Sequence, residues 1–251
     1  MKKVIAISSS GRQKNTYQLI QSAAPLLKEA GISLQIIHLS NYLIQDCKGC
    51  EACILSDRCP IKDDVIGILE KLGQADGIIL TSPVYMAGVS GQLKRFIDRT
   101  CKWYHRPELV KKPVLLMTTT AGGYADEVLD YMEKVATFWG MHLCGRVKRN
   151  VKTWDEAVSR KELKFFIKAV EEGEETEWIP TKDQVIAFQV QKTLAMNILP
   201  RDRKYWIEHG YDVQVYYEEN DVPFYLKWMG NSFYSFFSRI IKKNPLNRRI
   251  F

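Results

Sequence analysis

The feature that most constrains the fold of this 251-residue chain is a regular alternation between short apolar runs and segments with helical apolar spacing. The apolar runs predict five strands, at residues 4–7, 32–39, 77–80, 114–118 and 142–147. The helical spacing predicts helices at residues 16–30, 65–72, 91–101, 125–139 and 155–170. Consecutive parallel strands need a crossover between them, so residues 1–170 are predicted to form an α/β, doubly wound domain with a five-stranded parallel sheet.

The C-terminal end of the chain differs from this body. Residues 171–181 read EEGEETEWIPT and are expected to form an acidic linker. Residues 182–251 form a C-terminal extension, with helical spacing over 183–199 and 200–211 and many aromatic and basic residues after that. We expect this extension to be mainly helical and to pack on the body or on a neighbouring subunit, because aromatic stretches usually belong to cores or interfaces.

Positive charge is concentrated at the end of the extension. The chain carries a net charge of +7, and residues 224–251 hold six Lys or Arg and no acid, which leaves the rest near neutrality. A near-neutral body is not expected to bind nucleic acid. The basic and aromatic segment leaves peripheral contact with an anionic membrane as an alternative to packing. Its helical pattern is expected to be interrupted by Asn231 and Ser232 and ended by Pro245.

The apolar content of the sequence, including its N-terminal run, indicates the cellular compartment in which the protein is expected. No apolar run approaches the roughly 18 residues that a membrane span needs. The run at residues 4–7 is too short for the apolar core of a signal peptide. We therefore expect a cytoplasmic protein.

Four of the six cysteines fall within a thirteen-residue window, in the pattern Cys47-x2-Cys50-x2-Cys53-x5-Cys59. In a cytoplasmic chain such clustering indicates metal or redox chemistry before structural disulfides. Cys101 and Cys144 lie in predicted regular elements and are expected to be small buried hydrophobic residues.

Three loops of unusual composition follow predicted strands: SSSGRQKNT at residues 8–16, SPVY within residues 82–99, and TTTAGGY at residues 118–124. In an open α/β sheet, ligands bind outside the carboxyl ends of the strands. The first loop offers hydroxyls, an arginine, an asparagine and a helix N-terminus, which suit one terminal phosphate. It contains neither GxGxxG nor a Walker sequence. The alternative is a serine-rich turn that caps the helix.

Together these loops resemble those of the flavodoxin-like superfamily and, within it, the NAD(P)H-dependent FMN reductases. The match covers residues 1 to about 170 and is most specific in SPVY followed by GQLKRFIDR. The resemblance implies a sheet order of 2-1-3-4-5 and bound FMN. The residues that it assigns to the phosphate are Ser9, Arg12, Asn15 and Thr16, and those that it assigns to the isoalloxazine are Pro83, Val84, Tyr85, Thr119, Ala121 and Gly122. Relatives usually show Gly-Ser-Pro-Arg where this chain has Ser8-Ser9-Ser10-Gly11, so Arg12 is displaced by one position.

The cysteine spacing, with Pro60 after the last cysteine, resembles ferredoxin-type ligation. On a flavodoxin-like body it is similar to the iron-sulfur flavoproteins of anaerobes. That resemblance implies a [4Fe-4S] cluster held by Cys47, Cys50, Cys53 and Cys59. The alternative is that these four residues are free thiols or disulfides.

The leading functional hypothesis is an FMN-dependent redox flavoprotein that passes electrons between a [4Fe-4S] cluster, FMN and a small acceptor or ferredoxin-like donor. A second hypothesis is a cluster-free NAD(P)H-dependent FMN or quinone reductase. A third is a non-enzymatic electron carrier or thiol redox sensor. No catalytic acid or base can be assigned. Because the cysteine loop, residues 40–62, follows an edge strand, we expect a homodimer or homotetramer whose interface includes this loop and brings cluster and flavin together between chains.

Overall fold

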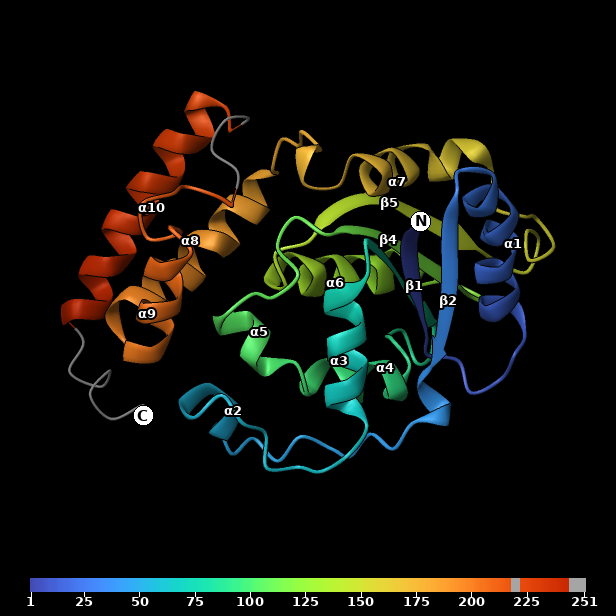
Figure 1. The fold of residues 1–251 in the computed structure, drawn as a ribbon, viewed down its shortest axis with the longest axis horizontal. Coiled ribbons are helices and arrows are strands. Elements are labelled where there is room, and N and C mark those ends of the chain that lie inside the picture. The colour runs from blue at the N-terminus through green and yellow to red at the C-terminus, as the bar shows by residue number, and fades with distance from the viewer. Residues whose placement is uncertain (218–221, 244–251) are drawn as a thin grey trace.

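The computed structural model describes residues 1–217 and 222–243, and it contains one five-stranded sheet. All the neighbouring strands are parallel, and their order is β2-β1-β3-β4-β5 (Figure 1). The strands are β1 (Lys2–Ser8), β2 (Ile32–His38), β3 (Gly77–Pro83), β4 (Pro113–Thr119) and β5 (His142–Arg149). The predicted fold class and strand order are therefore confirmed.

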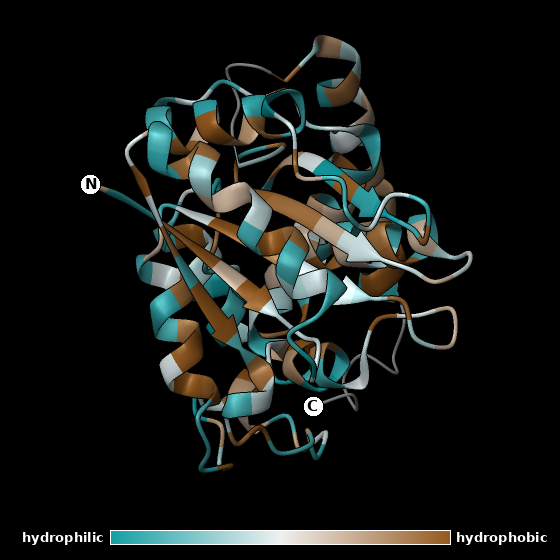
Figure 2. Ribbon diagram, turned by 90° about the vertical axis from the view of Figure 1, so that its right-hand side faces the viewer, coloured by the Kyte–Doolittle hydropathy of each residue, from teal (hydrophilic) through white to brown (hydrophobic). Residues whose placement is uncertain are grey.

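Helices cover both faces of the sheet because successive strand residues point to opposite sides. Ile5 and Ile7 pack with one core cluster, while Val4 and Ala6 pack with another. The first cluster lies under α3 (Val65–Gln74), α4 (Gly91–Asp98) and α6 (Ala125–Phe138), and the second under α1 (Asn15–Glu29) and α7 (Arg160–Glu172). Figure 2 shows the resulting apolar strands between the two helical layers.

Two predicted helices of the body have different bounds in the structure. The segment predicted as one helix over 91–101 divides into α4 and a short α5 (Cys101–His105), because the chain turns at Arg99 and Thr100. The last body helix begins at Arg160 rather than at residue 155. Ser159 caps it in a reciprocal box with Glu162, whose carboxylate also accepts two hydrogen bonds from Arg149, at 2.9 and 3.0 Å.

The cysteine loop, residues 40–62, contains little regular structure. It begins within η1 (Leu39–Asn41) and includes one short helix, α2 (Ala52–Leu55). Figure 1 shows this loop running from the end of β2 beneath α3 to α2, which lies near α5 and α9. The sequence pattern indicated an irregular segment here, and the structure confirms it.

The C-terminal extension is helical and has its own apolar core. Beyond η2 (Gly173–Glu175) it contains α8 (Lys182–Asn197), α9 (Pro200–Glu208) and α10 (Phe224–Lys243). Phe188 and Trp206 are almost completely buried within it. Gln191 of α8 donates hydrogen bonds to the carbonyls of Tyr104 and Phe138, at 2.7 and 3.0 Å, so the extension packs on the body of its own chain.

The expectation that Asn231 and Ser232 interrupt the last helix is wrong, because α10 continues through both residues. Both are exposed, whereas Leu226 and Ile241 are buried on the inner side of the helix. Tertiary packing thus outweighs the weak helix propensity of Asn and Ser. The expected stop at Pro245 lies outside the described residues. None of the helices in the described parts of the chain is long and apolar enough to cross a bilayer.

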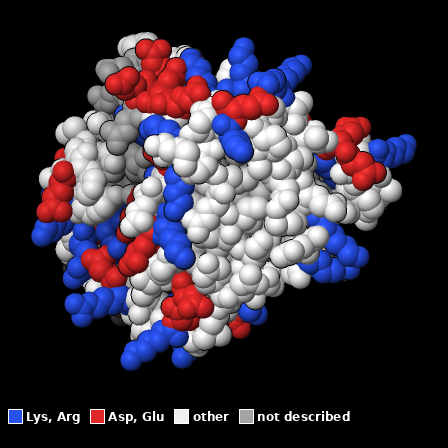
Figure 3. Space-filling view, turned by 45° about the vertical axis from the view of Figure 1, so that its right-hand side comes forward, with Lys and Arg blue, Asp and Glu red and all other residues white. Residues whose placement is uncertain are grey.

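Acidic and basic side chains are interspersed on the face of the molecule shown in Figure 3, where they border a broad uncharged area. This distribution agrees with the near-neutral charge of residues 1–223.

Candidate functional site

A cavity of about 220 Å³ lies at the carboxyl ends of β1, β3 and β4, where three loops meet. It is lined by Ser10, Arg12, Lys14, Asn15, Thr16, Pro83, Val84, Tyr85, Thr119, Thr120, Ala121 and Trp154. Loops from three separate strands converge there because parallel strands end at the same edge of the sheet. We call this cavity the loop pocket.

One end of the loop pocket is suited to an anion. The N-terminus of α1 begins at Asn15, and the first hydrogen bond that closes its opening turn runs from the Gln18 amide to the Lys14 carbonyl. The preceding amides of the first turn have no partner within the helix and carry the positive end of its dipole. Arg12 and Lys14 add two exposed cationic side chains at the same end. The combination can bind a terminal phosphate.

The loops after β1 and β4 are joined inside the pocket. The hydroxyls of Thr16 and Thr119 lie 2.6 Å apart, and both residues are buried. The Val84 amide donates to the Thr119 carbonyl at 2.9 Å, which extends the pairing of β3 and β4 into their loops. Three of the predicted contact residues are thus held in one hydrogen-bonded arrangement.

The loop after β3 ends in a tight turn at the mouth of the pocket. Tyr85 and Gly88 exchange backbone hydrogen bonds of 2.9 and 3.0 Å. The two residues between them, Met86 and Ala87, have φ values of 47° and 61°. Positive φ at two non-glycine residues is unfavourable and often marks a functional loop. The Tyr85 ring is 44% exposed, so it can form one wall for a planar ligand.

Eight of the ten predicted flavin-contact residues line the loop pocket, and two do not. Ser9 is buried, and its hydroxyl donates to the Thr81 carbonyl at 2.8 Å. Gly122 is exposed in the next turn, where its amide donates to the Thr120 hydroxyl at 3.1 Å. In this structure Ser9 therefore supports the loop from behind, and Gly122 shapes the turn beside the pocket.

Four residues of the loop pocket were not predicted from the sequence: Ser10, Lys14, Thr120 and Trp154. Three of them are neighbours of predicted residues. Trp154 follows β5 and fell just before a predicted helix, so no local pattern identified it. Its indole N–H is buried and has no hydrogen-bond partner, which leaves a donor available to a ligand. This unpaired donor, the two cations and the flat aromatic wall fit a flavin mononucleotide.

The thiols of the four loop cysteines are close enough for the other three to change the pKa of Cys53. Cys47 and Cys50 are exposed, while Cys53 and Cys59 are half-buried. Burial raises the pKa of the Cys53 thiol, and the neighbouring thiols of Cys59, Cys47 and Cys50 raise it further. Cys53 lies in the short helix α2 and is less exposed than Cys47 and Cys50.

A fifth thiol joins this group. Cys101, at the start of α5, is exposed rather than buried, so the expectation for this residue is wrong. Packing around its sulfur raises the pKa of the thiol to about 11, with further contributions from Cys47 and Cys53. Residues 47 and 101 are far apart in the sequence, and only the fold brings them together. Cys144 is buried as expected, and burial raises its thiol pKa to about 12.

Arg99 anchors both ends of the cysteine run to the end of α4. Its guanidinium donates to the Gln45 carbonyl at 3.0 Å and to the Cys59 sulfur at 3.4 Å, and it forms a buried ion pair with Asp63. Burial alone would raise the pKa of Asp63, but hydrogen bonds from Arg99 and from the Gln45 and Val65 amides hold it below its usual value. The loop is thus fixed at its entry and its exit by one side chain.

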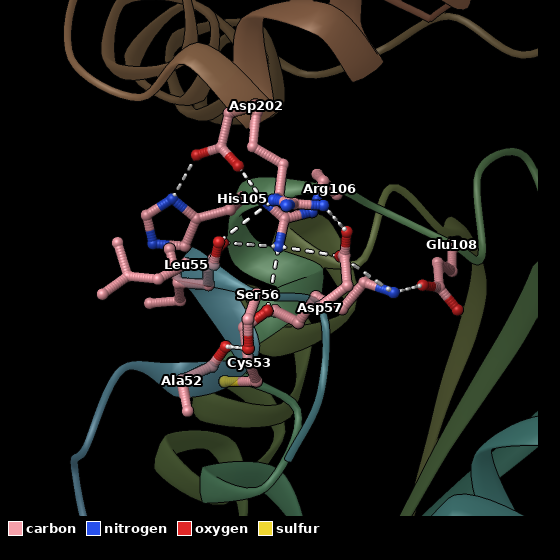
Figure 4. A network of polar contacts seen from close by, with 12 residues as sticks. Ala52, Cys53, Leu55, Ser56, Asp57, His105, Arg106, Glu108 and Asp202 are labelled. Atoms are coloured by element: carbon pink, nitrogen blue, oxygen red, sulfur yellow. Dashed lines mark hydrogen bonds and ion pairs between the residues drawn. The ribbon is translucent and has the colours of Figure 1, made fainter.

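A second buried arginine connects the cysteine loop to the C-terminal extension (Figure 4). Arg106 donates to the carbonyls of Cys53 and Ile54, at 2.9 and 3.0 Å, and it pairs with Asp202 of α9. The Asp202 side chain is completely buried and also contacts Nδ1 of His105 at 2.8 Å. We call Arg106, His105 and Asp202 the buried network. It makes α9 part of the surroundings of Cys53.

The cysteine loop and the loop pocket are separate sites. No cysteine lines the loop pocket. A different cavity, of about 480 Å³, lies beside the cysteines, and its walls include Cys53, Cys59, Arg99 and Trp103. The thiol donors suit an iron-sulfur cluster chemically. Within the described residues, however, no three His, Cys, Asp or Glu side chains are arranged to hold a metal ion.

Comparisons with known proteins agree with this geometry. A family model described as NADPH-dependent FMN reductase matches residues 2–156. An iron-sulfur flavoprotein of Methanocaldococcus jannaschii is 48% identical over 99 residues, which are 39% of this chain and 51% of that protein. One from Archaeoglobus fulgidus is 42% identical over 98 residues, covering 39% and 48% of the two chains. Another from the same organism is 33% identical over 142 residues, covering 56% and 64%. The matches span from about half to just under two thirds of these relatives' length.

Solved structures share the fold. A flavone reductase superposes with a TM-score of 0.57 at 18% identity and covers 70% of this chain and 65% of its own. RosB, in a crystal structure with a bound 8-demethyl-8-formylriboflavin-5'-phosphate intermediate, superposes with a TM-score of 0.56 at 14% identity and covers 71% and 82%. At these identities the similarity extends to the fold alone.

Proposed function

The chain belongs to the NADPH-dependent FMN reductase family, and we propose that it is an FMN-dependent oxidoreductase of the iron-sulfur flavoprotein type. The observation that carries the flavin part of this proposal is the convergence of three strand-end loops on one pocket. That pocket is lined by cationic groups and helix amides and by the partly exposed Tyr85 side chain.

In the proposed complex, Arg12, Lys14 and the first-turn amides of α1 bind the phosphate of FMN. The Trp154 N–H donates to the bound ligand, and the Tyr85 ring and the Val84 backbone border the isoalloxazine. Bound FMN supplies the capacity to take up two electrons and release them singly. The side chains of this pocket bind and orient the cofactor, and among the residues that the structure describes they include no histidine or carboxylate that would serve as a catalytic acid or base.

The cluster part of the proposal has separate support. The x2, x2, x5 cysteine spacing is of ferredoxin type, and the relatives named above are iron-sulfur flavoproteins. A [4Fe-4S] cluster on Cys47, Cys50, Cys53 and Cys59 would supply one-electron transfer. A ferredoxin-like protein or NAD(P)H is the proposed donor, and a small oxidant is the proposed acceptor.

The separation of the two sites motivates a proposal on assembly. The cysteines do not reach the loop pocket of their own chain, and electron transfer requires the two cofactors to be close. We infer a homodimer or homotetramer in which the cysteine loop of one protomer faces the flavin of another. Light scattering of the purified protein tests this inference, and a monomer at working concentration would refute it.

One observation favours a second candidate function, a cluster-free NAD(P)H-dependent FMN or quinone reductase. The loop cysteines, although close, form no ready metal-binding group in the described residues. In that case the four loop cysteines and Cys101 are free thiols, and the raised pKa of Cys101 keeps its thiol protonated at neutral pH. The flavin chemistry of the loop pocket would be unchanged.

Anaerobic purification with cofactor analysis separates these functions. Mass analysis of the heat-released chromophore is expected to identify FMN, and FAD alone would contradict the pocket assignment. Iron and sulfide in stoichiometric amounts, lost in Cys59→Ser and retained in the control Cys144→Ala, support the cluster. FMN without iron assigns the protein to the cluster-free reductases. A loaded protein that turns over with none of NADH, NADPH and reduced ferredoxin is a carrier or sensor.

A further inference from the structure

The last helix of the extension is held in a fixed rotation about its axis. Its inner side includes Gly230, where an added Cβ would lie 2.8 Å from a Val215 methyl and 3.1 Å from a Val185 methyl. Only a glycine allows so close an approach of backbone to core. Leu226, one turn earlier, is 2% exposed on the same side. The helix therefore cannot roll to bury its opposite face.

That opposite face carries large apolar side chains in contact with solvent. The exposed fractions are 82% for Phe224, 66% for Tyr225, 67% for Trp228, 63% for Phe236 and 46% for Ile240. At about 100° per residue the first four of these side chains fall on the half of the helix that faces away from Gly230, and Ile240 lies at the edge of that half. Figure 1 shows α10 along the outer edge of the extension, on the far side of the molecule from α1. An exposed apolar patch of this kind usually marks a binding surface.

The charges on the same helix are all positive. Lys227, Arg239, Lys242 and Lys243 lie within α10, which contains no Asp or Glu among its twenty residues. The last two follow Ile240 at the C-terminal end of the helix. Arg239, Lys242 and Lys243 lie on the outward half of the helix, so a two-fold pairing of this face with a second copy would bring six positive charges together without one carboxylate from the helix to balance them. The charge is complementary instead to an anionic surface.

We propose that the outward face of α10 binds an anionic lipid surface, lying in the interfacial layer parallel to it. Trp, Tyr and Phe side chains favour that layer because their rings are apolar while the Trp and Tyr tips form hydrogen bonds. Lys and Arg extend from the same helix to lipid phosphates. The aromatic and aliphatic side chains provide the apolar area that is buried on binding, and the basic residues give the preference for anionic headgroups. This proposal is independent of the redox function and of the cysteine chemistry.

Vesicle flotation of the full-length protein tests the proposal. Binding is expected to vesicles that contain phosphatidylglycerol, to be at least tenfold weaker to pure phosphatidylcholine, and to fall with added salt. Trp228 gives a local signal, because the other five tryptophans are buried or half-buried. Brominated lipids should quench its fluorescence on binding. Trp228→Phe should bind normally but lose this quenching.

Two double variants separate the contribution of the basic residues to lipid binding from that of the apolar side chains. Lys242→Gln with Lys243→Gln should weaken binding to anionic vesicles roughly 30-fold, equivalent to about 1 kcal/mol per charge. Trp228→Ser with Phe236→Ser should also weaken it, with an unchanged urea midpoint showing that the fold is intact. The matched control is Phe165→Ser in α7, which is 67% exposed and lies on a different face.

Three results would overturn the proposal. Equal binding to neutral and anionic vesicles would show that the basic residues do not contribute to binding. No binding to either kind of vesicle would reject a lipid partner. A dimer that dissociates in the Trp228→Ser, Phe236→Ser variant would assign this face to a second copy of the chain.

Discussion

Asp202→Ala should destabilise the protein more than any exposed substitution on α9. The Asp202 side chain is fully buried and contacts both Arg106 and His105. Its removal leaves the Arg106 guanidinium, which is 3% exposed, without its buried counter-charge. Loss of one partner from a buried pair costs about 3–5 kcal/mol. Arg106 keeps two carbonyl acceptors and the partly exposed Asp57, at 3.1 Å, so we expect the lower end, about 3 kcal/mol.

Urea unfolding followed by tryptophan fluorescence measures this change, because Trp206 lies on the same helix. The expected result is a lower midpoint with an unchanged slope. The matched control is Glu208→Ala, also on α9, which removes an exposed pair with Lys204 and should cost less than about 0.5 kcal/mol.

A double-mutant cycle identifies the cause. If Asp202→Ala destabilises by leaving a buried charge, Arg106→Met in the same chain should recover part of the loss. The reasoning is refuted if Asp202→Ala costs no more than Glu208→Ala, or if the two losses simply add.

The remaining predictions concern the loop pocket, the cysteine loop and acid stability. Asn15→Ala and Thr16→Ala should each weaken FMN binding by about 1 kcal/mol in a fluorescence titration while the protein stays folded; full affinity in both would place the phosphate elsewhere. Arg99→Lys loses the forked contacts of the guanidinium, so thermolysin should cut the cysteine loop faster than in the control Arg160→Lys, an exposed arginine that pairs with Glu29 of α1, and equal rates would count against this anchor. Glu162 has its pKa lowered to about 2, chiefly by hydrogen bonds from arginine. Its stabilisation is complete above about pH 4.5 and is lost as the pH falls through 2, so Glu162→Gln should lower the urea midpoint at pH 7 but not at pH 2, and a pH-independent difference would exclude this linkage.

The fold was predictable because its determinants are local and periodic. Each strand is an apolar run bounded by turn residues, and each body helix has one apolar stripe. The alternation of the two elements restricts the topology to a parallel sheet with helices on both faces. Helix ends were less predictable. Ser159 and Glu162 form a capping box that the sequence shows, but the apolar spacing upstream of it placed the helix start too early.

The site was predictable where its residues lie in the loops that follow strands. Trp154 was not, because its position depends on the turn after β5 rather than on any pattern around it. Cys101 and Asp202 were missed for a related reason. Cys101 was assigned to a helix as a buried residue, and Asp202 reaches Arg106 across 96 positions of sequence. Contacts of that separation are decided by tertiary packing, and a single sequence carries no signal for them.

The buried network has a consequence for the order in which the chain matures. Domains fold as they emerge during synthesis, N-terminal parts first. All the strands and all five thiols of the cysteine group precede residue 150, but Asp202 lies in the last quarter of the chain. Arg106 therefore lacks its buried counter-charge, Asp202, until α9 has left the ribosome. Until then the cysteine loop lacks the contact between Arg106 and Asp202 that supports the Cys53 and Ile54 carbonyls.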